Sequence, residues 1–108
     1  MFTIEEELES QIEKDKRIVE RGKALKRLLT STDFRNVILS GFLREHALEL
    51  VYERANSSEA DDKTSRKIDG VAQFKAYLDK VIEDAEYAEK AVTENSETLY
   101  QSRNEEIQ

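Results

Sequence analysis

The sequence predicts an all-α protein of three long helices, and three observations support this prediction. The chain of 108 residues contains no proline, and its three glycines, Gly22, Gly41 and Gly70, fall inside helical repeats rather than between them. Proline and glycine are the strongest local breakers of regular structure. Apolar residues also recur at the three- and four-residue spacing of a helix that buries one face. We therefore expect a single helical domain over residues 1–108, with an antiparallel hairpin of the first two helices and a long third helix packed along it.

The first helix is predicted over residues 3–29. Thr3 and Glu6 have the spacing of a capping box, in which the hydroxyl and the carboxylate each satisfy an otherwise unpaired backbone N–H. Acidic residues fill the first turns and basic residues crowd the second half, and both placements favour the helix dipole. Gln11 and Asp15 interrupt the apolar seam. We expect this half of the helix to be loosely packed or to meet a polar partner.

The second helix is predicted over residues 33–55. It follows a cluster of capping residues in which Thr30 and Asp33 again have capping-box spacing. A helix that is apolar over much of its circumference is normally covered from more than one direction. We therefore expect the segment 34–52 to form the core, and Gly41 to mark a close helix crossing against Gly22. The residues expected to be buried are Phe34, Ile38, Phe42 and Leu48, and a second stripe beside them consists of Leu39, Leu43, His46 and Leu50.

Residues 56–64 are polar and form the expected loop, and the third helix is predicted over residues 65–102. Its stripe keeps a strict three-four spacing over four heptads, which is typical of a coiled coil. At about 1.5 Å per residue this helix is about 57 Å long, longer than either of its partners. It therefore either overhangs them or breaks near Asn95, and residues 103–108 are expected to fray. The stripe consists of Val71, Phe74, Leu78, Val81, Ala85, Ala88, Val92, Asn95 and Leu99.

Composition and charge exclude several classes of protein. The net charge of -7 argues against a nucleic-acid binder, because phosphate contacts need a basic surface. The absence of cysteine excludes disulfides, a thiolate nucleophile and cysteine-ligated metals. The first residues have neither a basic start nor an apolar run, and no stretch is apolar enough to span a membrane. We expect a soluble, cytoplasmic protein without a membrane contact.

No residue pattern predicts catalysis or a cofactor. His46 is the only histidine, and nothing near it in sequence resembles a nucleophile. The Glu-x-x-His pattern of di-iron bundles is absent because the third residue before His46 is Leu43. Carboxylate pairs such as Glu83/Asp84 and Glu86/Glu89 fit a solvated helix face. We therefore expect no enzyme, no cofactor, no metal and no small-molecule substrate.

Charge is distributed unevenly along the chain. Residues 1–30 carry seven acidic and seven basic groups, whereas residues 56–108 carry thirteen acidic and seven basic groups. The basic groups near the end of the first helix fit a match to its dipole better than a phosphate site. The acidic second half fits a solvated face, and the alternative is that it imitates nucleic acid. In that alternative the chain is a small acidic inhibitor of a host nucleic-acid-binding protein.

The middle of the chain, about residues 20–55, has a leucine-rich stretch over residues 22–29, then Asp33-Phe34, then Gly41-Phe42 inside the next helix. In this pattern it resembles small helical proteins encoded among the structural and assembly genes of tailed bacteriophages. It implies a non-enzymatic phage protein of virion structure or assembly, located in the host cytoplasm and open to incorporation in the virion. It carries no catalytic residue to this chain.

We therefore expect a protein that acts through helix–helix contacts, either with copies of itself or with a larger phage structural protein. The expected contact surface combines the side stripe of the second helix with the far end of the third helix. Exposed apolar residues at regular spacing usually mark such a surface. The residues predicted to bind protein are Leu39, Leu43, Leu50, Val92 and Leu99.

Overall fold

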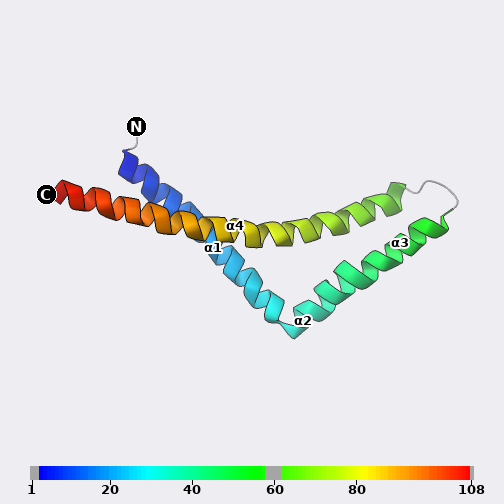
Figure 1. Cartoon of the computed structure of the whole chain (residues 1–108). Coiled ribbons are helices and arrows are strands. Elements are labelled where there is room, and N and C mark those ends of the chain that lie inside the picture. Colours follow the sequence, from blue (N-terminus) through cyan, green and yellow to red (C-terminus); the bar gives the residue numbers. More distant parts are fainter. Residues whose placement is uncertain (1–2, 58–61, 108) are drawn as a thin grey trace. The chain divides into compact units, whose positions relative to one another are not determined.

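The computed structural model describes residues 3–57 and 62–107, and every regular element in these two ranges is a helix. In chain order the elements are α1 (Ile4–Thr30), α2 (Thr32–Phe34), the π-helix η1 (Arg35–His46), α3 (Ala47–Asn56) and α4 (Asp62–Ile107) (Figure 1). The all-α fold class predicted from the sequence is confirmed. None of the helices in the described part of the chain combines the length and apolar character needed to cross a membrane.

Side-chain caps define the first two helix starts. The backbone N–H of Glu6 donates to the Thr3 hydroxyl at 3.1 Å, as the capping-box spacing predicts. At the second start the cap is Ser31 and not Thr30, because the N–H of Phe34 donates to the Ser31 Oγ at 3.3 Å. Thr30 is still the last residue of α1, and its hydroxyl donates to the carbonyl oxygen of Arg27 at 2.7 Å. An N-cap residue has a non-helical backbone, and Ser31, with φ of −72° and ψ of 126°, meets this condition, whereas Thr30 belongs to α1.

The predicted second helix consists of three consecutive helical pieces, α2, η1 and α3, over residues 32–56. In the π-helix η1 the backbone hydrogen bonds span five residues rather than four. A Cβ on Gly41 would lie 3.1 Å from the carbonyl oxygen of Asn36, five residues earlier in the same helix. A side chain at Gly41 would therefore be crowded by its own helix. The predicted crossing of Gly41 with Gly22 stays a prediction.

The chain divides into two compact units, which are described separately. Unit 1 comprises residues 1–24 and 81–108, and unit 2 comprises residues 25–80. Both α1 and α4 continue through the boundary between the units. The expected single domain thus has two regions of internal packing.

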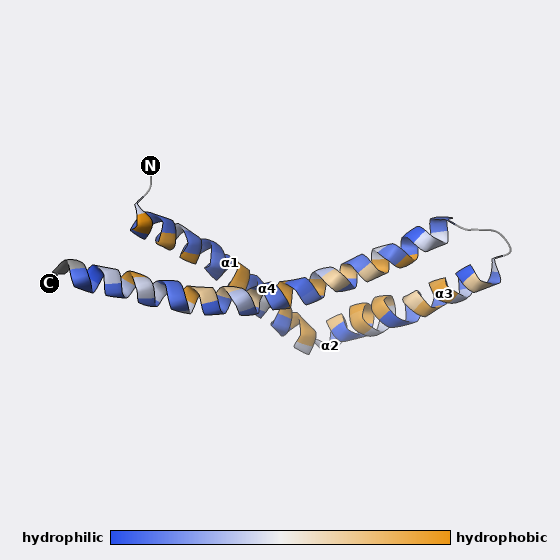
Figure 2. Cartoon of the chain, turned by 45° about the horizontal axis from the view of Figure 1, so that its top comes forward, coloured by the Kyte–Doolittle hydropathy of each residue, from blue (hydrophilic) through white to orange (hydrophobic). Residues whose placement is uncertain are grey.

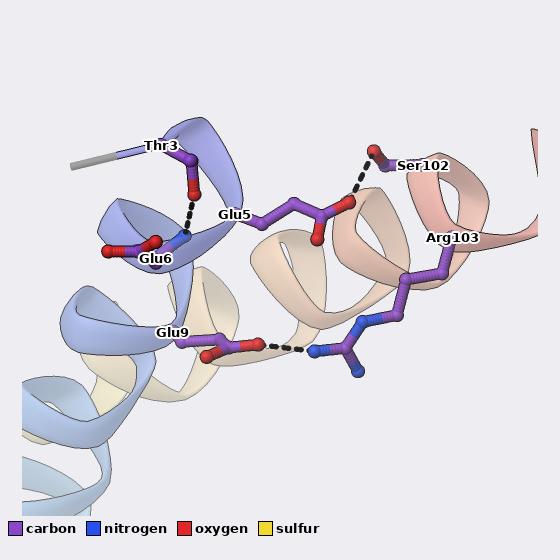
Figure 3. A network of polar contacts seen from close by, with 6 residues as sticks. All are labelled: Thr3, Glu5, Glu6, Glu9, Ser102 and Arg103. Carbon is purple, nitrogen blue, oxygen red and sulfur yellow. Dashed lines mark hydrogen bonds and ion pairs between the residues drawn. The ribbon is translucent and has the colours of Figure 1, made fainter. Parts of the chain in front are cut away.

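In unit 1, α1 lies antiparallel to the second half of α4. The Ser102 hydroxyl donates to Glu5 Oε1 at 3.3 Å, and the Arg103 guanidinium pairs with Glu9 (Figure 3). Further along the pair, Gly22 lies so close to Ala85 that a Cβ at position 22 would collide with the Ala85 methyl group. The first turns of α1 thus reach the far end of α4. The argument that Leu99 overhangs shorter partners is therefore wrong, and Leu99 is buried.

In unit 1, α1 and α4 approach each other closely because the residues at their contact are small. Ala85 and Ala88 of the predicted stripe indicate such an approach. The buried apolar residues of this unit are Ile12, Val81, Ala85, Ala88 and Leu99, and Asp15 is buried with them. Every position of the predicted stripe on α4 is buried or half-buried. The antiparallel hairpin predicted for the first and second helices is not part of unit 1, and it stays a prediction.

In unit 2, η1 and α3 run antiparallel to the first half of α4 (Figure 1). The Thr64 hydroxyl donates to Glu53 Oε1 at 3.3 Å near the end of α3. Further along the pair, the rings of Phe42 and Phe74 meet edge to face with centroids 5.6 Å apart. These two contacts place residues of α3 and η1 opposite residues of α4 in reversed order.

The prediction that residues 34–52 form the core is wrong. Phe34, Ile38 and Phe42 are only half-buried. Leu48 is 50 % exposed and Tyr52 is 64 % exposed. The reason is that the described residues of unit 2 cover this helix mainly from one direction, with the first half of α4.

The ends of the third helix also differ from the prediction. α4 begins at Asp62 rather than near residue 65, and an acidic residue in the first turn is favourable to the helix dipole. It continues unbroken past Asn95 to Ile107. Its last turns do not fray at residue 103, because Arg103 pairs with Glu9 of α1. Of the expected loop, residues 58–61 lie outside the described residues.

Candidate protein–protein interface

The first candidate site is an apolar groove along unit 2, here called the Phe42 groove. Its volume is about 600 Å³, and only one of its lining residues, Lys67, carries a full charge. Phe42 is central to it, because its ring stacks on His46 at 5.6 Å on one side and meets Phe74 on the other. The lining residues are Ile38, Phe42 and His46 from η1, and Lys67, Gly70, Val71 and Phe74 from α4.

A second, smaller groove runs along the same helix pair and is here called the Val51 groove. Its volume is about 230 Å³, and it shares Val71 with the Phe42 groove. Its one charged lining residue, Lys75, is paired with Asp79 at 2.8 Å. The lining residues are Leu43, Ala47, Val51, Ile68, Val71, Ala72 and Lys75. A pair of antiparallel helices thus leaves apolar side chains uncovered along two grooves.

Several large apolar side chains of unit 2 are exposed to solvent. Figure 2 shows hydrophobic ribbon along η1 and the start of α3, whereas the C-terminal end of α4 is mostly hydrophilic. A contiguous exposed apolar patch on a small protein usually marks a contact site. The large exposed apolar residues of unit 2 are Leu28, Val37, Leu48, Val51, Tyr52 and Tyr77.

The buried hydroxyl of Thr64 forms a hydrogen bond between α3 and α4. Thr64 lies in the first turn of α4, is 1 % exposed, and donates to the carboxylate of Glu53. A hydrogen bond to a charged group is among the stronger side-chain bonds. This bond links α3 to the first turn of α4.

We expect Thr64→Val to lower the free energy of unfolding by about 1 kcal/mol, because valine keeps the shape but loses the hydroxyl. Urea denaturation at fixed protein concentration measures the change. Thr98→Val is the matched control, because the Thr98 hydroxyl is exposed and bonds only within its own helix, to the Glu94 carbonyl oxygen at 3.0 Å. Equal losses in the two variants would contradict a special role for Thr64.

The five residues that the sequence predicts to bind protein differ in how far they are buried in the structure. Leu43 lines the Val51 groove. Leu99 lines a groove of about 540 Å³ in unit 1, between α1 and α4. Leu50 and Leu99 are buried within the chain, and Leu39 and Val92 are half-buried. A contact through Leu50 or Leu99 would require the helix pair that covers it to open.

Gly70 is not among the residues predicted from the sequence to form a contact surface, and Ile38, Phe42 and Phe74 were predicted to lie in the core or the stripe. One signal for Gly70 was present: a glycine in the interior of a long helical repeat costs about 1 kcal/mol relative to alanine. In the structure a Cβ at Gly70 would meet no described atom within 4 Å beyond the neighbouring backbone of its own helix. No contact among the described residues therefore requires a glycine there.

The only histidine of the sequence lies beside a carboxylate and a phenylalanine ring. His46 Nδ1 lies 3.7 Å from Glu49 Oε2 on the same helix, and its ring packs on Phe42. Within residues 3–57 and 62–107 no group of three or more histidine, aspartate and glutamate side chains is placed to hold a metal ion. In unit 1, the acidic residues Glu86, Glu89 and Glu94 share one side of α4 with Lys90. This side of α4 therefore carries more negative than positive charge.

Comparison of the chain with models of known protein families, with curated proteins and with solved structures gave no match.

Proposed function

We propose that this chain is a non-enzymatic protein–protein interaction module that acts through helix–helix contacts, as a structural or assembly protein of a phage particle. The observation that carries the proposal is the uncovered apolar surface of unit 2, which includes the Phe42 and Val51 grooves. Covering such a surface with another helix releases water from apolar area, which is the main driving force for association. The resemblance of residues 20–55 to small phage proteins supports the assignment to a particle.

The stripe on α4 supports the same proposal. Its positions keep heptad spacing, and α1 covers part of it in unit 1 at Ala85 and Leu99. A heptad stripe supports packing against further helices in the manner of a coiled coil. We propose that the assembled protein uses α4 as its coiled-coil-like arm in the host cytoplasm and in the finished particle.

The test is incorporation of the chain into particles. Particles purified from infected cells should contain the chain at a fixed ratio to the main structural protein, measured by quantitative mass spectrometry. Val51→Glu should reduce this ratio, because a carboxylate in the Val51 groove must lose its hydration when a partner covers it. Tyr87→Glu is the control, since Tyr87 is 76 % exposed, lies in unit 1 and lines neither of the two grooves. Particles that form normally and contain none of the chain would overturn the proposal.

The alternative function rests on the charge of unit 1. Its residues include fifteen acidic and seven basic side chains, a net charge of −8. An acidic helix face of this kind can occupy a basic nucleic-acid site, in which case the chain would inhibit a host nucleic-acid-binding protein. A host protein that the chain captures, and that added DNA releases, would favour this alternative over particle assembly.

A further inference from the structure

The π-helix η1 is unusual in its length. It covers twelve residues, Arg35–His46, whereas most π-helical segments are single turns inside an α-helix, frequently at functional sites. The residues that flank it, Phe34 and Ala47, have ordinary α-helical angles, with φ of −62° and −60°. The chain thus changes from α-helical to π-helical hydrogen bonds and back within the continuous run of residues 32–56.

The wide turns of η1 decide which side chains of this helix face α4. On an α-helix of 3.6 residues per turn, each step of four residues drifts by about 40° around the axis, so Phe34 and Leu50 would lie about 160° apart. A π-helical turn holds more residues, and steps of four then stay closer to one face. In the structure Leu50 is buried and the other members of such a row are half-buried. The row consists of Phe34, Ile38, Phe42, His46 and Leu50.

An α-helix over the same residues would turn a different apolar stripe toward α4. On an α-helix the side stripe of the sequence stays within about 60° of arc, whereas Phe42 lies about 80° from Leu50. Leu50 is 2 % exposed and so fixes the orientation of α3. An α-helical η1 attached to it would bring Leu39 toward α4 and turn Phe34 away. The side stripe consists of Leu39, Leu43, His46 and Leu50.

Gly41 lies where the two hydrogen-bond patterns compete. A Cβ on this residue would lie 3.1 Å from the carbonyl oxygen of Asn36, five residues earlier, which is tighter than an ordinary van der Waals contact. At Gly70, in the α-helix α4, a Cβ would meet no such carbonyl oxygen. Glycine also disfavours an α-helix relative to alanine. Both effects favour the π-helix at Gly41, and a methyl group there would reverse both.

We infer that residues 35–46 form a conformational switch between a π-helix and an α-helix, and that Gly41 holds the balance on the π-helical side. In the π-helical state the ring of Phe42 meets Phe74 at 5.6 Å. In the α-helical state the side stripe replaces this contact, while α3 stays in place through Leu50. A molecule that binds one state better than the other would shift the balance by that difference in affinity. The switch belongs to the single chain and does not depend on the proposed function.

Nuclear magnetic resonance of the full chain tests the switch, because scalar couplings across hydrogen bonds identify the carbonyl group that each amide contacts. We expect couplings that span five residues within residues 35–46 of wild type. In Gly41→Ala they should span four residues in most molecules, and the nuclear Overhauser effect between the rings of Phe42 and Phe74 should be lost. The helical circular dichroism should stay that of wild type, since both states are helical.

Gly70→Ala is the matched control, because it makes the same replacement in unit 2 at a position where the Cβ meets no described atom within 4 Å beyond the neighbouring backbone of its own helix. It should leave the couplings of residues 35–46 unchanged. Couplings that span four residues in wild type, or five residues in Gly41→Ala, would overturn the switch. Loss of all couplings in Gly41→Ala would overturn it as well, since the second state must be an ordered helix. Conversion of η1 in Gly70→Ala would remove the role of Gly41.

Discussion

Replacing Gly22 by leucine is expected to lower the free energy of unfolding by about 3 kcal/mol, because the added side chain has no space. Gly22 is buried where α1 meets α4, and even a Cβ there would collide with the methyl group of Ala85. The carbonyl oxygen of Val81 lies 3.6 Å from the same position, so the backbone of α4 also blocks the side chain. Leucine has a higher helix propensity than glycine by almost 1 kcal/mol, and the clash must outweigh this gain.

Urea denaturation at one protein concentration measures the loss, since any self-association makes apparent stability depend on concentration. Lys23→Leu is the matched control, because it places the same side chain on the next residue, which is exposed. We expect the control to change the free energy of unfolding by less than about 0.5 kcal/mol. A Gly22→Leu variant as stable as this control would show that α1 and α4 do not touch at Gly22.

The sequence predicts the helices well because the signals for a helix are local. The absence of proline, the Thr3 cap and the regular apolar spacing act within a few residues, and the observed helices follow them over residues 4–30, 32–56 and 62–107. The spacing on the third helix also identifies the buried face of α4 in unit 1. For α4, the face that the apolar periodicity predicts to be buried is the face that is buried or half-buried in the structure.

The packing partners are harder to predict, because periodicity does not state what covers a face. Phe42 and Leu48 belong to an apolar face, yet Phe42 is half-buried and Leu48 is half-exposed since unit 2 supplies only α4 as a cover. The two glycines Gly22 and Gly70 look alike in sequence, and only the neighbouring atoms separate a close contact from an open groove. The wide turns of η1 also have no local signal that we recognise in residues 35–46.

Asp15 is expected to weaken unit 1, so that Asp15→Leu raises the free energy of unfolding by about 1–3 kcal/mol. The side chain is 6 % exposed in the apolar seam of α1. Gln11 Nε2 donates to its Oδ1 at 3.1 Å, but among the described residues nothing donates to its Oδ2. A buried carboxylate oxygen without a partner has lost its bonds to water without replacement. Leucine removes this cost and adds apolar burial, and the exposed amide of Gln11 returns to water.

Asp15→Asn separates charge from shape, because the amide occupies nearly the same volume without the charge. We expect a smaller gain than with leucine, since an amide still needs hydrogen bonds in the seam. Urea denaturation of both variants at matched concentration gives the two changes. A loss of stability in Asp15→Leu would contradict the cost assigned to Oδ2. It would mean that the carboxylate has a polar partner in solution, as the sequence analysis expected for this half of α1, and the search for that partner would begin with basic groups on a second protein.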